Sequence, residues 1–78
     1  MSNDAVRDWI AAEVRSEIAR QNRRHLDAAA ILGIHKASLS NRMRAKQSFR
    51  SEELAMLADW LDVPVSKFLP NNVAKVAV

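Results

Sequence analysis

Basic side chains are concentrated in the middle of this 78-residue chain, between positions 15 and 50. Nine lysines and arginines fall in that segment against two acidic residues, Glu17 and Asp27, which gives it a net charge of +7. The flanking segments, 1–14 and 51–78, each carry a net charge of −2. Such a block is typical of a site for a polyanion, most often a nucleic acid, although a solvated helix face gives the same pattern. The basic residues are Arg15, Arg20, Arg23, Arg24, Lys36, Arg42, Arg44, Lys46 and Arg50.

The histidines, serines and carboxylates do not have the spacing of a metal or catalytic centre. His25 and His35 stand ten positions apart, the chain has no cysteine, and no carboxylate lies at metal-ligand spacing from either histidine. Ser40 has no adjacent base, and we find no Ser-His-Asp set, paired carboxylates or glycine-rich phosphate loop. We therefore expect neither an enzyme nor a metal, cofactor or small-molecule site.

The composition predicts one small, all-helical domain. Hydrophobic residues make up 49% and charged residues 27% of the chain, as in ordinary globular proteins. One glycine and two prolines are too few for sheets joined by tight turns, whereas the helix formers alanine, glutamate and arginine are frequent. The apolar stretch 28–34 is too short to cross a bilayer, and Asp4, Arg7 and Asp8 stand where a signal peptide is apolar. We therefore expect a cytosolic protein without membrane contact.

Hydrophobic spacing and helix-end signals predict a compact fold of five helices. The first begins near Asn3, and the last has Pro64 in its first turn and ends before Pro70. Residues 1–70 then form the domain, and residues 71–78 form a tail that is either disordered or adds a short strand. The predicted helices cover residues 3–21, 26–32, 36–44, 51–61 and 64–69.

The second and third predicted helices form a helix-turn-helix pattern. Gly33, the only glycine, suits the left-handed residue that ends a helix, and a turn of three residues that contains it leads to the next helix. On that next helix Leu39 and Met43 stand four positions apart and are expected to face inward. The remaining sides of the helix are therefore free for a partner.

The segment 28–43 resembles the core of the phage Cro and repressor type of helix-turn-helix protein. The resemblance rests on a small alanine, a glycine four positions later, a β-branched residue and a Leu-Ser pair, and it extends over about residues 14–69. It implies a five-helix domain that binds operator DNA as a dimer and regulates transcription. The chain departs from the family at His25, where a glutamine is frequent, at His35 in place of a capping serine or threonine, and at Ala45 in place of glycine. The matching residues are Ala29, Gly33, Ile34, Leu39, Ser40 and Met43, then Phe49–Leu54 and Trp60–Pro64.

The same resemblance assigns contacts to individual residues. Lys36, Ala37, Ser40 and Asn41 occupy base-reading positions, and Arg42 is expected to reach a base as well. Asparagine can pair with adenine, lysine can donate to guanine, and alanine can touch the methyl group of thymine. Phosphate contacts are expected on both sides of the groove. They would come from Arg23, Arg24, His25, Ser38, Arg44, Lys46, Gln47 and Arg50.

Dimer contacts are expected in the C-terminal part, at Trp60, Phe68, Val73 and Val76. The small size favours a Cro-like repressor in the bacterial cytosol, of the kind that phages encode, over a two-domain repressor. Two alternatives keep the same fold. One is an antitoxin that regulates its own operator, and the other is an antirepressor that binds a protein.

Overall fold

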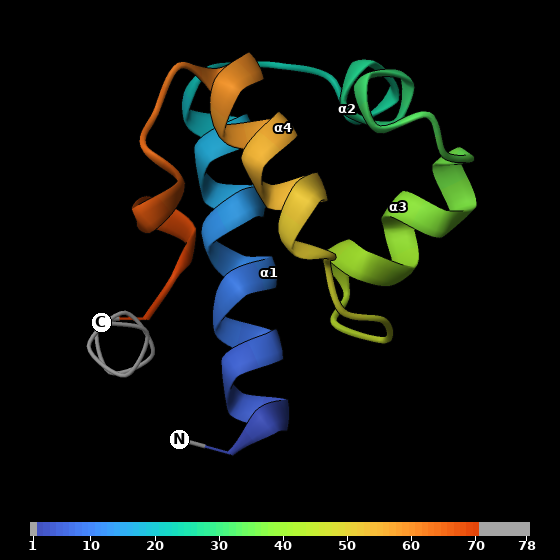
Figure 1. Ribbon diagram of the computed structural model, residues 1–78. Coiled ribbons are helices and arrows are strands. Elements are labelled where there is room, and N and C mark those ends of the chain that lie inside the picture. Colours follow the sequence, from blue (N-terminus) through green and yellow to red (C-terminus); the bar gives the residue numbers. More distant parts are fainter. Residues whose placement is uncertain (1, 71–78) are drawn as a thin grey trace.

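The computed structural model describes residues 2–70, which form α-helices and one 3₁₀ helix, with no strand in that range (Figure 1). The all-helical class predicted from the composition is therefore confirmed. The predicted tail over 71–78 lies outside the described residues. The elements are α1 (Asn3–Arg20), α2 (His25–Leu32), α3 (Lys36–Met43), α4 (Ser51–Leu61) and the 3₁₀ helix η1 (Val65–Phe68).

The fifth predicted helix is wrong in type and length. Residues Val65–Phe68 form a single 3₁₀ turn, and Pro64 precedes it as the N-cap instead of lying in its first turn. Only five residues separate Pro64 from Pro70, and a residue before proline is disfavoured in the α conformation. The segment is therefore too short for an α-helix, and 3₁₀ geometry is the usual form of so short a turn.

A residue with left-handed backbone follows each α-helix. These residues have φ values of +56° to +67°, and the amide of the next residue bonds back to a carbonyl in the last turn of the preceding helix, as in Arg23 N to Ile18 O at 3.0 Å. Left-handed residues end helices because they turn the chain while satisfying the last carbonyls. Only one of the four is glycine, so the glycine content of the sequence indicated the end of only one of the four α-helices. The residues are Asn22, Gly33, Ala45 and Asp62.

The core is formed by side chains from all five elements. Phe68 of η1 is fully buried, as are Val14 of α1 and Leu57 of α4. Burial of such side chains contributes about 1.5–3 kcal/mol each to stability relative to exposure. The 3₁₀ turn therefore belongs to the folded unit. The buried cluster comprises Val14, Ile18, Ala28, Ala29, Leu39, Met43, Leu54, Leu57, Ala58, Leu61 and Phe68.

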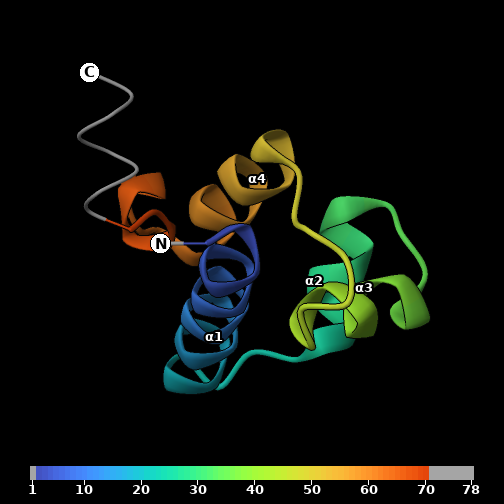
Figure 2. The ribbon, with the colours of Figure 1, turned by 90° about the horizontal axis from the view of Figure 1, so that it is seen from below.

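The helices pack around the long α1. Figures 1 and 2 both place η1 on one side of α1 and the α2–α3 pair on the other. α2 packs against α3 and α4, α3 packs against α1, and η1 packs against both α1 and α4. α3 lies at the edge of this arrangement, on the side of α1 opposite η1 (Figure 1).

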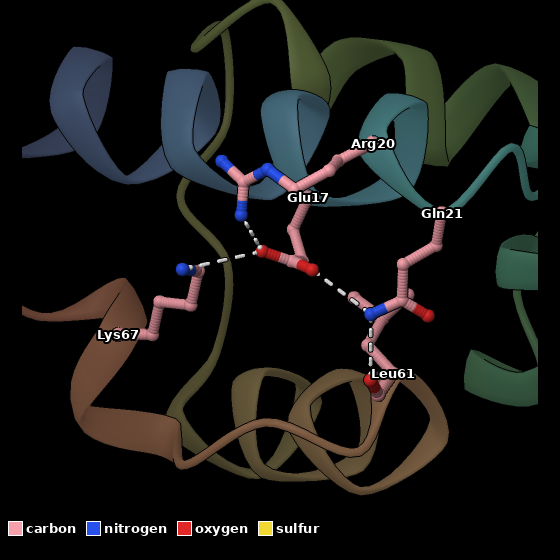
Figure 3. Close-up of polar contacts among 5 residues, drawn as sticks. All are labelled: Glu17, Arg20, Gln21, Leu61 and Lys67. Atoms are coloured by element: carbon pink, nitrogen blue, oxygen red, sulfur yellow. Dashed lines mark hydrogen bonds and ion pairs between the residues drawn. The ribbon is translucent and has the colours of Figure 1, made fainter.

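A buried carboxylate joins α1 to the C-terminal elements (Figure 3). Glu17 is 4% exposed, and its carboxylate accepts hydrogen bonds from Arg20 and from Gln21 Nε2, the latter at 2.9 Å. Lys67 Nζ of η1 lies 3.4 Å from the same carboxylate, and Gln21 also donates to the carbonyl of Leu61 at 2.7 Å. The hydrogen bond from Gln21 lowers the pKa of Glu17, burial opposes that effect, and Lys67 and Arg20 lower the pKa further. The charged carboxylate thus fixes the end of α4 and η1 against α1.

Candidate nucleic-acid interface

Two buried side chains anchor α3 to the core of the domain. Leu39 is 1% exposed and Met43 is 3% exposed, which confirms that these residues face inward. Before α3, the turn of Gly33, Ile34 and His35 separates it from α2, and Gly33 has the left-handed backbone predicted for it. The anchored residues fix the rotation of α3 about its axis, and this rotation decides which residues point outward.

The outward side of α3 carries the residues to which the sequence assigns base contacts. Lys36, Ala37 and Ser40 are exposed and Asn41 is half-buried. At 3.6 residues per turn these four positions form one continuous side of the helix, and Arg44 extends it by a further turn. The structure therefore brings these residues together on one surface.

Arg42 does not belong to that surface. Its Nε lies 2.9 Å from Glu53 Oε1 of α4, and Nη1 donates to the carbonyl of Ser38 at 3.2 Å. Only 12% of its side chain is exposed, so its guanidinium is directed into the protein and not toward a ligand. The assignment of Arg42 to a base contact is therefore wrong. Arg42 lies on the side of α3 that faces Glu53, and it forms an ion pair with that carboxylate.

The end of α3 and the loop that follows expose several of the predicted phosphate contacts. Arg44, Lys46, Gln47 and Arg50 are all exposed, while Ser38 is half-buried. Among residues 2–70, the three basic side chains of this group make no ion pair. Their charges are therefore available to an anion that approaches α3.

The predicted contacts before α2 are exposed, and two of them have partners within the chain. The guanidinium carbon of Arg23 lies 4.8 Å from the centre of the Trp60 ring. Both Nε and Nη2 of Arg24 donate to the Asp27 carboxylate at 3.2 Å, which offsets part of the Arg24 charge. His25, the first residue of α2, is also exposed.

Arg15 of α1 is a neighbour of this surface that the sequence analysis did not single out. Its guanidinium donates across the α1–α3 contact to the carbonyl of Met43, at the end of α3. The only signal in the sequence is its place in the basic block, because the contact joins residues 28 positions apart. Arg15 is itself exposed, so it borders the same solvent-facing region.

The predicted dimer contacts within residues 2–70 differ in how far their side chains are exposed. Trp60 is half-buried, with Arg23 stacked on its ring, and retains some exposed surface. Phe68 is fully buried among the core side chains, so its assignment to a dimer surface is wrong. The 3₁₀ turn packs against α1 and α4 and directs the aromatic ring inward. Val73 and Val76 lie outside the described residues.

Within residues 2–70, no helix is both long enough and apolar enough to cross a membrane. Within the same residues, no three histidine, cysteine, aspartate or glutamate side chains gather in a way that could hold a metal ion.

Comparisons of the chain with protein-family models, with curated proteins and with solved structures give no match.

Proposed function

We propose that this protein is a sequence-specific regulator of transcription that binds double-stranded DNA, with α3 in the major groove. One observation carries the proposal: Leu39 and Met43 anchor α3 while Lys36, Ala37 and Ser40 on its outward side are exposed. A recognition helix needs this division, because it must be fixed to the domain and still present its N-terminal residues to base edges. The α2–turn–α3 unit has the helix-turn-helix connection, and the resemblance to Cro and repressor proteins supports the same role.

The outward side chains suit direct reading of bases. Lys36 can donate to the guanine acceptors, Ala37 can contact the thymine methyl group, and Ser40 can pair with several bases. Asn41 can form two hydrogen bonds with adenine. The major groove distinguishes all four base pairs by such contacts, so this small set is sufficient for sequence preference at several positions.

The exposed cations around α3 supply the sequence-independent part of the binding. Arg44, Lys46 and Arg50 follow the recognition helix, and His25 begins α2 on the other side. Neutralisation of DNA phosphates releases counterions, so binding through these groups weakens steeply as salt increases. The acidic residues of the flanking segments leave these four groups unpaired within residues 2–70, although Glu53 engages Arg42 of the same block.

We further propose that two copies bind a pseudopalindromic operator in the bacterial cytosol, as the family resemblance implies. Two recognition helices related by a two-fold axis would lie about 34–36 Å apart on successive major grooves. Of the two predicted dimer contacts within residues 2–70, Trp60 has exposed surface and Phe68 is buried. Sedimentation of the protein with and without an operator duplex measures the stoichiometry directly.

Selection from a pool of randomised duplexes, near physiological salt, tests the function. We expect enrichment of an inverted repeat whose half-sites lie about one helical turn apart. Retention without enrichment would contradict sequence specificity, and no retention at low salt would contradict nucleic-acid binding altogether. A Lys36→Ala/Asn41→Ala double variant should lose the enrichment. Met56→Ala, which alters an exposed residue of α4, is the matched control and should keep it.

A further inference from the structure

A hollow of about 270 Å³ runs beside α3, between α1 and the start of α2. Three different helices contribute polar side chains to its walls. Lys36 and Arg44 stand eight positions apart, so the hollow extends for about 12 Å along α3 at 1.5 Å per residue. The polar lining residues are Arg15, His25, Lys36, Ser40 and Arg44.

The charge in this hollow is of one sign. Within residues 2–70, Arg15, Lys36 and Arg44 make no ion pair, and no carboxylate lines the walls. Its floor is apolar, since Leu39 and Met43 form the bottom. Charges above a floor of low polarity attract an anion more strongly than the same charges spread over a surface in water.

Arg15 is oriented before any ligand binds. One N–H of its guanidinium donates to the carbonyl of Met43, which fixes the group at the C-terminal end of α3. A guanidinium has five N–H donors, and the exposed side of the group keeps donors free for a second acceptor. A planar fork of this kind matches the paired oxygens of a phosphate.

We propose that this hollow binds one backbone phosphate of duplex DNA, with Arg15 of α1 as a phosphate ligand that also positions α3. This inference rests on the proposed function and deepens it, because it extends the DNA-binding surface from the helix-turn-helix unit to α1. Lys36 and Ser40 lie at the border between the hollow and the base-facing side of α3, so the bound phosphate would lie beside the bases that α3 reads. The register of α3 along the groove would then depend on a residue outside α2 and α3.

The test compares three variants by their affinity for the duplex that the selection enriches, measured over a range of salt concentrations. Arg15→Gln removes the charge, Arg15→Lys keeps it, and Arg20→Gln removes one charge from the same helix outside the hollow. The Arg20 side chain is 58% exposed and engaged by Glu17. We expect Arg15→Gln to weaken binding about tenfold, as for loss of a hydrogen bond to a charged group, and to lower the salt slope by about 0.9. Arg15→Lys should restore the salt slope, and Arg20→Gln should leave both values near those of the unaltered protein.

A second arm identifies the phosphate and separates binding from folding. Single uncharged methylphosphonate linkages are placed in turn along the duplex, and the unaltered protein should lose affinity at one position that Arg15→Gln no longer senses. A purely structural role for Arg15 would leave the two proteins equally sensitive at every position, and this would overturn the inference. Equal effects of Arg15→Gln and Arg20→Gln would overturn it too, while DNA binding by the unaltered protein would still uphold the proposed function. Failure of the unaltered protein to bind any duplex would instead reject the proposed function itself, and the phosphate site with it.

Discussion

Arg42 and Glu53 form a nearly buried ion pair that joins α3 to α4, with Nε 2.9 Å from Oε1 and side-chain exposures of 12% and 9%. The same Glu53 oxygen accepts the backbone N–H of Arg50 at 2.9 Å, so one carboxylate fixes both the start of α4 and the side of α3. The pair therefore contributes to the orientation of the proposed recognition helix, although neither residue lies on its outward side.

Glu53→Gln should lower the free energy of unfolding by about 3 kcal/mol, because it leaves the Arg42 guanidinium buried without its counter-charge. Urea unfolding followed by circular dichroism measures this loss. Glu52→Gln, on the exposed side of the same helical turn, is the control and should change stability by less than about 0.5 kcal/mol. Equal losses in the two variants would show that the ion pair contributes little.

The stability contributed by Glu17 should depend on pH. Its pKa in the folded protein lies below 4.5, mainly because Gln21 donates to the carboxylate. A lowered pKa means that the unfolded chain takes up the proton first as pH falls, so the contribution is complete above the unfolded pKa and is lost through the folded one. Urea midpoints between about pH 6 and pH 3 should therefore fall more steeply for the unaltered protein than for Glu17→Gln. Parallel curves would contradict the assignment.

Two reciprocal substitutions test the left-handed helix ends. Gly33 has φ of +67°, and beyond its two chain neighbours no residue has an atom within 4 Å of the position that a Cβ would take, so Gly33→Ala should cost only backbone strain, about 1 kcal/mol. Ala45 has φ of +61°, so Ala45→Gly should relieve a similar strain and stabilise the protein by up to about 1 kcal/mol. Thermal melts should shift by about 4–8 °C per kcal/mol in opposite directions. A shift of the same sign for both would contradict the strain argument.

Asn41→Ala should weaken binding to the selected operator by about 1–3 kcal/mol and relax preference at one base pair of each half-site. The reason is that alanine removes a pair of hydrogen bonds to a base edge and leaves the phosphate contacts intact. Competition with duplexes altered at each position measures the effect, with Met56→Ala as control. An equal loss of affinity on every sequence would reject Asn41 as a base-reading residue.

Arg44→Ala should weaken binding to all duplexes alike and lower the slope of affinity against salt by about one, as expected for one phosphate contact. Its side chain is exposed and makes no ion pair within residues 2–70, so no internal rearrangement should accompany its loss. Fluorescence anisotropy titrations at several salt concentrations give the slope. A loss confined to particular sequences would place Arg44 against a base instead.

Local patterns in the sequence determined much of the helical structure. The predicted span of α4 is the observed one, and α3 begins where the spacing places it. Leu39 and Met43 face inward as their four-residue spacing requires, and Gly33 ends α2 in the left-handed conformation. These features depend on residues a few positions apart, because helix periodicity and helix ends arise from local hydrogen bonds and side-chain spacing.

Tertiary packing decided which of the predicted site residues remain available. Phe68 is in the core because η1 turns back against α1 and α4, and Arg42 is engaged because the fold brings Glu53 of α4 within 2.9 Å of its Nε. Arg15 reaches the end of α3 from a helix that the helix-turn-helix pattern does not include. In each case the deciding contact joins segments that are distant along the chain. The sequence shows which side chains carry charge or apolar surface, and only the packed structure determines which of them already have a partner.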